Sequence, residues 1–533
     1  MDLKYWSVKQ IYVALFWIMP FLLKAQDVEI KGTIRDAQGE NLPLANLIIL
    51  PDSILTSSDV TGSYTARVHR GSKTLRLTYT GYEPFIASGE ILGDTTLNFV
   101  LTPRVDLLQE VVITTERFSH GDLVHSASSG TSVLSQKDMH TMPSLLGEPD
   151  IIRALQLLPG TVRGMEGSSD TFVRGGAADQ NLVLLDGAPI YNTGHLLGFM
   201  SIFNPDIIDQ VEMINGGFPA EFGGRLSSVM NISTVSNIPD QTTISADIGL
   251  ISSRIKLEQP IVKDKASFWV TGRRTYVDEL IKRFSSYELP YFFHEVNGKV
   301  IFHPSSSHQI EIGHHAGEDN LDYLRDKERD NDEMLTTFNS RTSSQTFKWR
   351  HTTPDLWRNE LSMFRTAFDT RSQNQYKDYL VSGYSKLEDY GAKFNLKRDS
   401  IWGDASLSTG VEWIRHGLSP NVLHSEGSIA DLLRSSSTEG EMFHEFAAYI
   451  QQEWSVFPRL RINAGIRASM ASVDDAQYIF PEPRISARYA LGQNAAFKLN
   501  YSKMVQYIHR ISSSAISSPI DVWYPVTEKI RPQ

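Results

Sequence analysis

The stretch LRINAGIRASM, residues 460–470, alternates apolar and polar side chains without a break. Its apolar members are Leu460, Ile462, Ala464, Ile466, Ala468 and Met470. Successive side chains of a β-strand point to opposite faces, so the stretch predicts a strand with one apolar face and one very polar face. The same alternation recurs at 405–413, 484–491 and 497–502, and we expect about twelve such strands after Gln241.

The connections between these strands distinguish a membrane barrel from a soluble sandwich, which shows the same alternation. Short turns lie near Lys263, Ser305, Pro354, Phe457 and Gly492. Long polar stretches, expected to be loops, lie at 275–290, 316–340, 369–388, 418–440 and 471–482. Short turns on one rim and long loops on the other are typical of an outer-membrane β-barrel, whereas a sandwich has no reason to sort loop length by rim. Each strand also has about nine to eleven usable residues, the length that a tilted membrane strand requires.

The charged side chains of these strands are expected to face the lumen. They are Arg459, Arg461, Arg467, Lys498 and Glu412. An Arg or Lys on the lipid side at the bilayer centre would cost about 2–4 kcal/mol. Hydrocarbon contains no water for backbone N–H and C=O groups, so the strands must pair all the way round.

The segments before the strands differ in pattern from them. Residues 1–25 predict a secretory signal peptide, with Lys4 and Lys9 ahead of an apolar run and Ala25 as the small residue for cleavage. Residues 26–103 hold several short alternating runs between turns, which predict an Ig-like β-sandwich. Residues 104–134 form a linker, residues 135–236 a compact α+β unit with a helix over 150–158, and residues 237–533 the first part of the barrel.

Composition excludes several classes of protein. The 533 residues include 51 Lys plus Arg and 62 Asp plus Glu, a net charge of -11 that disfavours nucleic acid as a partner. The absence of cysteine excludes disulfides, thiolate metal sites, thiol nucleophiles and the lipid-carrying cysteine of a lipoprotein.

The remaining polar motifs do not predict catalysis. The pairs His294–Glu295 and His444–Glu445 lack the second histidine of a zinc protease, and adjacent His314 and His315 would point to opposite faces of a strand. The glycines of FVRGGAADQNLVLLDG, residues 172–187, are not followed by the Lys and hydroxyl residue of a phosphate-binding loop. We therefore expect no enzyme activity, no cofactor and no metal site, with Arg174 and Asp186 pairing with charges on the inner face of the barrel.

Four stretches together resemble the plug domain of TonB-dependent outer-membrane receptors. They are VRGG at 173–176, NLVLLDG at 181–187, PIYN at 189–192 and GGFPAEFGGRLSSVMNI at 216–232. The motif residues are Arg174, Gly175, Gly176, Asp186, Gly187, Gly216, Gly217, Gly223, Gly224 and Arg225. Residues 32–49 and 59–68 resemble the carboxypeptidase regulatory-like β-sandwich that precedes the plug in such receptors.

The resemblance implies a mainly β protein of the cell outer membrane. A plug domain would fold inside a transmembrane antiparallel barrel of about 22 strands, surrounded by outer-membrane lipid. The chain would take up a scarce nutrient, a ferric siderophore or similar chelate, from the extracellular side. The alternative is an exported β-rich adhesion or glycan-binding protein without transport activity, in which every β element is soluble.

The resemblance also implies a partner, TonB, energised by its inner-membrane complex. The matching segment for TonB is EVVITT at 110–115, in which Glu110, Val111, Val112, Ile113 and Thr114 would add a strand to the partner. An edge strand of the plug is the alternative for this segment. The predicted strands are fewer than the family's barrel contains, and the last residues, EKIRPQ, lack a terminal aromatic, so we expect the sequence to be a fragment.

Overall fold

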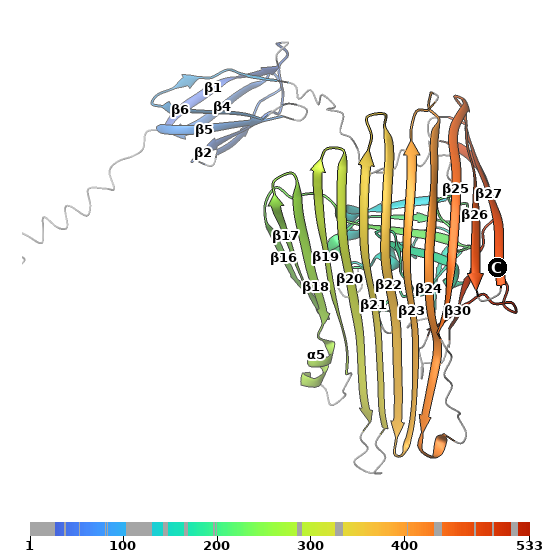
Figure 1. The fold of residues 1–533 in the computed structure, drawn as a ribbon. Helices are drawn as coiled ribbons and strands as arrows, with labels where there is room; N and C mark the ends of the chain where they lie inside the picture. The colour runs from blue at the N-terminus through green and yellow to red at the C-terminus, as the bar shows by residue number, and fades with distance from the viewer. Residues whose placement is uncertain are drawn as a thin grey trace, which may run out of the picture. The chain divides into compact units, whose positions relative to one another are not determined.

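The computed structural model describes residues 27–102 and 130–533 apart from short gaps. The gaps are 37–38, 53, 80–81, 83, 142–147, 165–168, 196–197, 199, 285–289, 326–333, 402, 431–439, 474–475, 493–494 and 513–520. The chain forms two compact units, residues 1–117 and 118–533, each described here by itself (Figure 1). The expected signal peptide lies outside the described residues.

The first unit contains two sheets packed face to face. One has the order β4 (Ser63–His69), β1 (Asp27–Asp36), β7 (Thr95–Thr96), with β8 (Phe99–Leu101) also on β1. The other has the order β3 (Ile54–Ser57), β2 (Asn46–Leu50), β5 (Gly71–Thr78), β6 (Phe85–Ile91). Ile30, Leu47 and Leu77 are completely buried between them. The predicted β-sandwich is therefore confirmed.

The second unit contains an α+β domain, here called the plug, built on a five-stranded sheet. Its order is β13 (Ala188–Pro189), β12 (Asn181–Leu185), β15 (Ser228–Thr234), β14 (Ile208–Ile214), β9 (Thr131–Ser135). A smaller ladder joins β10 (Thr161–Arg163) to β11 (Thr171–Val173). The helical turns are α3 (Gln136–Thr141), α4 (Ile151–Leu155), η2 (Ala178–Gln180) and η4 (Pro205–Ile207).

The predicted helix over 150–158 is shorter in the structure. The Asp150 side chain caps α4 by accepting a hydrogen bond from the Arg153 N–H. The helix ends at Leu155, and turns follow as far as Gly160. No helix in the described ranges is long and apolar enough to cross a membrane.

The rest of the second unit is one 13-stranded antiparallel sheet in which each strand pairs with the next along the chain. Its first strands are β16 (Thr243–Ile248), β17 (Ser252–Val262), β18 (Ala266–Thr275), β19 (Tyr291–Ser305), β20 (His308–Arg325), β21 (Met334–Thr352) and β22 (Trp357–Tyr376). Its last are β23 (Tyr379–Arg398), β24 (Ser406–Glu426), β25 (Glu441–Phe457), β26 (Leu460–Val473), β27 (Ala476–Ala490) and β28 (Ala496–Ser502). Within the described residues β16 and β28 are not paired with each other. Figure 1 shows the sheet curving around the plug, as expected for a partial antiparallel barrel.

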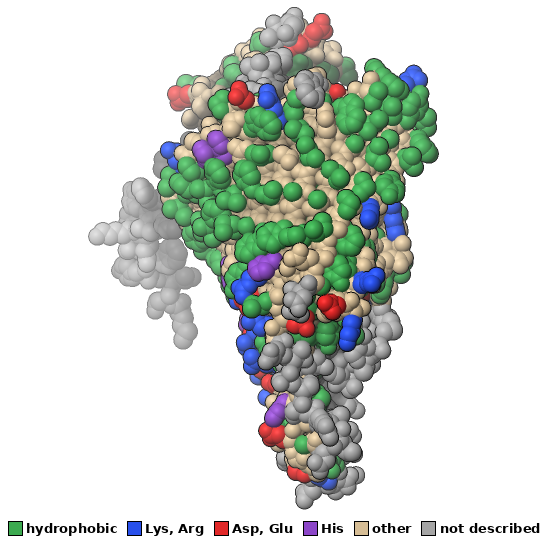
Figure 2. All heavy atoms as spheres, turned by 45° about the vertical axis from the view of Figure 1, so that its right-hand side comes forward, with side chains coloured by type: hydrophobic (Ala, Val, Ile, Leu, Met, Phe, Trp, Pro, Cys, Tyr) green, Lys and Arg blue, Asp and Glu red, His purple; other side chains and the backbone are tan. Residues whose placement is uncertain are grey.

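The alternating pattern assigns the two faces of this sheet correctly. Ile466 and Leu499 are 46% and 64% exposed on the outward face, whereas Arg467 and Glu482 are buried on the inward face. Figure 2 shows hydrophobic side chains spread over a broad area of the outward face. This arrangement suits a sheet with lipid outside and a polar domain inside.

Three of the predicted long loops are wrong. Residues 316–340, 369–388 and 471–482 belong largely to strands, and β20 to β24 have 18 to 21 residues rather than about ten. β22 and β23 are joined by Lys377 and Asp378 alone, with Lys377 at a φ of 52°. Beyond the apolar band both faces of a strand are polar, so the sequence loses its alternation while the backbone pairing continues. The stretch 275–290 is a genuine connection and contains α5 (Val277–Phe284).

Candidate functional site

The loop at 216–224, here called the GGFPAEFGG loop, is held by side chains from the inner face of the sheet. Arg484 of β27 donates hydrogen bonds to the backbone carbonyls of Phe218, Pro219 and Phe222. Lys393 of β23 donates to the carbonyl of Glu221 at 2.7 Å. A cationic side chain that bonds to several carbonyls orients a loop without fixing its side chains.

The inner face of the 13-stranded sheet is here called the wall. The close approach of the loop to the wall requires glycine at positions 217 and 223. A Cβ atom at Gly217 would lie 1.9 Å from Nδ2 of Asn500, and one at Gly223 would lie 2.3 Å from Nε of Arg467. Arg467 is 1% exposed and pairs with Glu412 at 2.6 Å. The loop therefore contacts the charged wall through its backbone.

Asp186 connects the other end of the plug motif to the wall. Its carboxylate lies 2.9 Å from Nζ of Lys299, which also pairs with Glu311 at 3.2 Å. Thr234 donates to the same carboxylate through its N–H and its hydroxyl. Burial alone would raise the pKa of Asp186, but the ammonium groups of Lys299 and Lys348 and the bonds from Thr234 hold the pKa below its usual value.

Arg174 does not make the expected contact with the wall. It has a φ of 48°, and its side chain lies beside Gly130, Gly160 and Gly216 of the plug. The described residues give Arg174 no carboxylate partner. Its neighbours in the motif differ: Gly175 and Gly187 have φ values of 81° and 90° in turns, and Gly176 packs closely on Ser227.

The segment YNTGH, residues 191–195, is attached to the wall at both ends, and sequence reasoning did not identify this role. The imidazole of His195 lies between carboxylates of the wall, with Nε2 2.5 Å from Oε1 of Glu295 and Nδ1 3.2 Å from Asp319. The Tyr191 hydroxyl donates to Asp389, which also contacts His416 at 2.8 Å.

The sequence does contain a signal for this attachment. Tyr191 and His195 are titratable residues four positions apart, with Gly194 between them. Glu295 and Glu445 face inward, while their neighbours His294 and His444 are exposed on the opposite face. In each of the pairs His294–Glu295 and His444–Glu445, the histidine and the glutamate therefore lie on opposite faces of the sheet and cannot act together. His314 and His315 also point to opposite faces, as the strand pattern predicts. In the described part of the chain, no group of three His, Asp or Glu side chains is arranged to hold a metal ion.

Residues 503–512 and 521–533 form a second element inside the sheet. Its hairpin, β29 (Ile508–Ser512) with β30 (Asp521–Pro525), lies against the inner face beside β23 and β24. Tyr507, Trp523 and Val526 pack on an apolar inner patch. That patch consists of Phe368, Leu387, Leu418, Phe443, Ala471 and Val473.

The same hairpin contacts the plug. Gln506 donates to Asp179 at 3.2 Å, and Arg510 pairs with Asp170 at 2.7 Å. Arg225 of the plug motif is 7% exposed, and its guanidinium lies 5.5 Å from the ring centroid of Trp523 and 5.9 Å from that of Tyr191. Plug and hairpin thus meet at Arg225. The expected TonB-contacting residues Glu110 to Thr114 lie outside the described residues.

A polar plug seated against the charged inner face of an antiparallel sheet whose outer face is apolar defines an outer-membrane receptor of the plug-and-barrel class. Family descriptions match three parts of the chain: TonB-dependent Receptor Plug Domain at 124–228, TonB dependent receptor-like beta-barrel at 279–507, and CarboxypepD_reg-like domain at 30–113. The chain belongs to the TonB-dependent receptor family, whose members are outer-membrane proteins.

Individual relatives agree with this assignment. The chain is 24% identical over 226 residues to the TonB-dependent receptor SusC of Bacteroides thetaiotaomicron, a match that covers 39% of this chain and 21% of SusC. Among solved structures, the siderophore receptor PirA of Pseudomonas aeruginosa superposes with a TM-score of 0.51 at 16% identity, covering 71% of this chain and 62% of PirA. The alcaligin receptor FauA of Bordetella pertussis gives 0.52 at 13% identity, with 72% and 64% covered. At these identities the structures show a shared fold, and the chain spans less than two thirds of each relative.

Proposed function

We propose that the protein is an energy-coupled receptor that takes up a scarce nutrient across the outer membrane. The observation that carries the proposal is the set of polar contacts between the plug and the wall, here called the polar seat. The GGFPAEFGG loop, Asp186 and the YNTGH segment are held by hydrogen bonds and ion pairs to the wall. Polar contacts of this kind can be exchanged for water, so a pulling force can move the plug without separating a large apolar interface.

The ligand class proposed is a ferric siderophore or similar chelate. PirA and FauA are named for siderophore and alcaligin reception, and the chain shares their fold. The adhesion alternative, with every β element soluble, does not explain the apolar outward face that holds Ile466 and Leu499.

TonB is the proposed partner, and Glu110 to Thr114 are the proposed contact segment. An extended segment rich in β-branched residues suits strand addition to the edge of a partner sheet. TonB, energised by its inner-membrane complex, would supply the work that moves the plug.

The test is uptake of a radiolabelled ferric siderophore panel by cells that carry the gene or a deletion of it. We expect the gene to restore growth in iron-limited medium and accumulation of at least one chelate. A variant with Val112→Pro, which removes a backbone donor from the proposed TonB strand, should retain chelate binding and lose accumulation. Binding and growth that are identical with and without the gene across the panel would contradict the proposed ligand class.

A further inference from the structure

The outward face of the sheet contains a groove of about 920 Å³ across β18 to β24. Its apolar lining includes Val270, Val296, Val300, Ile312, Phe347 and Met363. Five of these side chains, all except Phe347, are between 39% and 54% exposed. Gly298 creates the hollow, because its outward position between Val296 and Val300 carries no side chain. In a membrane this hollow is in contact with hydrocarbon, and an acyl chain fills it better than water.

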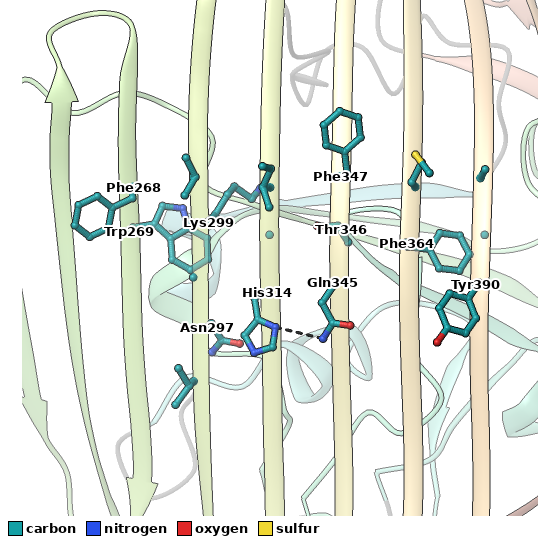
Figure 3. Close-up of a pocket in the computed structure, with 18 of the residues that line it drawn as sticks. Phe268, Trp269, Asn297, Lys299, His314, Gln345, Thr346, Phe347, Phe364 and Tyr390 are labelled. Atoms are coloured by element: carbon teal, nitrogen blue, oxygen red, sulfur yellow. Dashed lines mark hydrogen bonds between the residues drawn. The ribbon is translucent and has the colours of Figure 1, made fainter.

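A row of polar side chains crosses the sheet at one end of the groove. Strand register aligns Gly298, His314, Gln345, Arg365, Tyr390, Arg415 and His444 on adjacent strands. His314 and Gln345 are hydrogen-bonded, and Arg365 donates to Gln345 at 3.0 Å and to the Tyr390 hydroxyl at 3.2 Å. Figure 3 shows His314, Gln345 and Tyr390 at similar height on β20, β21 and β23, with Phe347 further along β21.

The polar row is a boundary between two environments. The next outward row on one side is apolar, and consists of Val300, Ile312, Phe347, Met363, Ala392, Trp413 and Phe446. On the other side, two rows on, stand Glu318, Arg341, Asp369 and Lys386. The groove therefore has an apolar body and a polar end at the edge of the apolar band, which matches the tail and head of a lipid.

The charge at this polar end is positive. Arg365 and Lys386 share one carboxylate, Glu388. Arg415 forms no ion pair within the described chain, and its Nη2 donates to the thioether sulfur of Met442 at 2.8 Å, a weak acceptor. The guanidinium groups of Arg365 and Arg415 each lie 5.9 Å from the centroid of the Tyr390 ring. Guanidinium groups held at an interface bind phosphate through paired N–H donors.

We propose that this groove is a binding site for a phosphorylated acyl lipid of one membrane leaflet, with the phosphate on Arg415 and an acyl chain in the hollow beside Gly298. Going from the apolar row to the polar row leads toward the strand ends whose connections include 276–290 and 427–440, the longer connections of the sheet. Longer loops are extracellular in outer-membrane barrels, so the lipid belongs to the outer leaflet.

The experiment is native mass spectrometry of the full chain in detergent, titrated with diphosphorylated lipid A and, in parallel, with phosphatidylethanolamine. We expect lipid A to bind more tightly, Arg415→Gln to weaken its binding about tenfold, and Gly298→Trp to remove it. Two control variants lie on the outward face outside the groove: Arg398→Gln near the other end of β23 and Ile466→Trp on β26. Both controls should bind lipid A like the unmodified chain.

Two outcomes would overturn the proposal. One is equal retention of both lipids by every variant, which describes a non-specific lipid shell. The other is a folded Arg415→Gln variant with unchanged affinity for lipid A. If Gly298→Trp does not fold, the test depends on Arg415→Gln alone. That variant is expected to fold, because the Arg415 side chain is partly exposed on the surface and contacts neither the plug nor a carboxylate. Nutrient uptake is not part of the measurement, so the result is independent of the proposed function.

Discussion

Arg484 connects the strand β27 to three carbonyls of the GGFPAEFGG loop and to Glu482 at 2.9 Å. Its replacement by Met keeps most of the side-chain volume and removes the guanidinium donor from those carbonyls, of which Pro219 still accepts from the Phe222 N–H. Each charge-assisted hydrogen bond contributes about 1.5–3 kcal/mol. We expect amide hydrogen exchange in residues 216–224 to accelerate at least about tenfold in Arg484→Met, measured by mass spectrometry.

Arg461→Met is the matched control for this change. Arg461 pairs with Glu453 and Asp404 and makes no contact with the loop. Its replacement should leave exchange in 216–224 unchanged. Equal protection of the loop in both variants would show that Arg484 does not hold it.

Asp52 in the β-sandwich supports a prediction about pH. Its carboxylate pairs with Lys73 at 2.7 Å and accepts a hydrogen bond from the His69 N–H. The bond from Lys73, opposed by partial burial, lowers the pKa of Asp52 below its usual value. A lowered folded-state pKa stabilises the fold above the unfolded-state pKa, and this stability is lost as the pH falls through the folded-state pKa. The contribution should therefore be complete at neutral pH and decline below about pH 4.

Calorimetry of the full chain as a function of pH measures this effect through the sandwich transition. Asp52→Asn should lower the Tm of that transition at pH 7 and reduce its change between neutral and acidic pH. Asp27→Asn, at an exposed position, is the control and should follow the unmodified chain. An unchanged acid profile in Asp52→Asn would exclude the Asp52–Lys73 pair as its source.

At the scale of elements, the fold could be predicted wherever the two faces of a strand have different surroundings. Residues 460–470 alternate because lipid lies on one side and the plug on the other, so even the inward direction of Arg467 was predictable. In residues 316–325 and 334–340 most outward side chains are polar, as are many inward ones, so the alternation that identifies a strand is lost. The register of β20 with β21 continues through that region, from His308 paired with His351 to Arg325 paired with Met334.

The site was only partly predictable for a related reason. Glycines and acidic residues identified the plug motif, but the partners of that motif are distant in sequence. The Tyr191–Asp389 and His195–Asp319 contacts span 198 and 124 residues. Arg174 was expected to pair with the wall, and it instead lies among glycines of the plug. The prediction failed because a charged residue in a sequence does not reveal which domain its side chain faces.

The hairpin turn at Lys377 and Asp378 gives a test of orientation. β22 and β23 extend to this turn at one rim, while Asp355 lies in the turn between β21 and β22 at the other rim. The chain contains no cysteine, so a single introduced thiol reports its own position. We expect a membrane-impermeant maleimide to label Asp378→Cys on intact cells and to label Asp355→Cys only after the outer membrane is permeabilised. The reverse result would invert the proposed orientation, including the leaflet assigned to the lipid site.

At the scale of the whole molecule, two bodies share the interior of the sheet, the plug and the β29–β30 hairpin. The plug is fastened mainly by polar contacts, while the β29–β30 hairpin is fastened to the inner wall by an apolar cluster and to the plug by Arg510 and Gln506. Apolar burial resists separation more than polar contacts that water can replace. We therefore expect the hairpin to stay with the wall while the plug moves.

A disulfide between the plug and the wall tests that movement directly. A Cβ atom built at Gly217 lies 3.2 Å from Cβ of Asn500 on β28, a separation close to the 3.5–4.5 Å of disulfide bonds. In Gly217→Cys/Asn500→Cys the clash with the Asn500 amide disappears, and the positive φ of Gly217 adds roughly 1–2 kcal/mol of strain. Ligand binding should persist in the oxidised protein, because the plug remains seated, whereas uptake should stop and return after addition of reductant. The reduced protein serves as the control for the substitutions themselves. Uptake at an undiminished rate with the bond formed would mean that the plug does not leave β28 during transport, and the role of the polar seat as a releasable attachment would then be wrong.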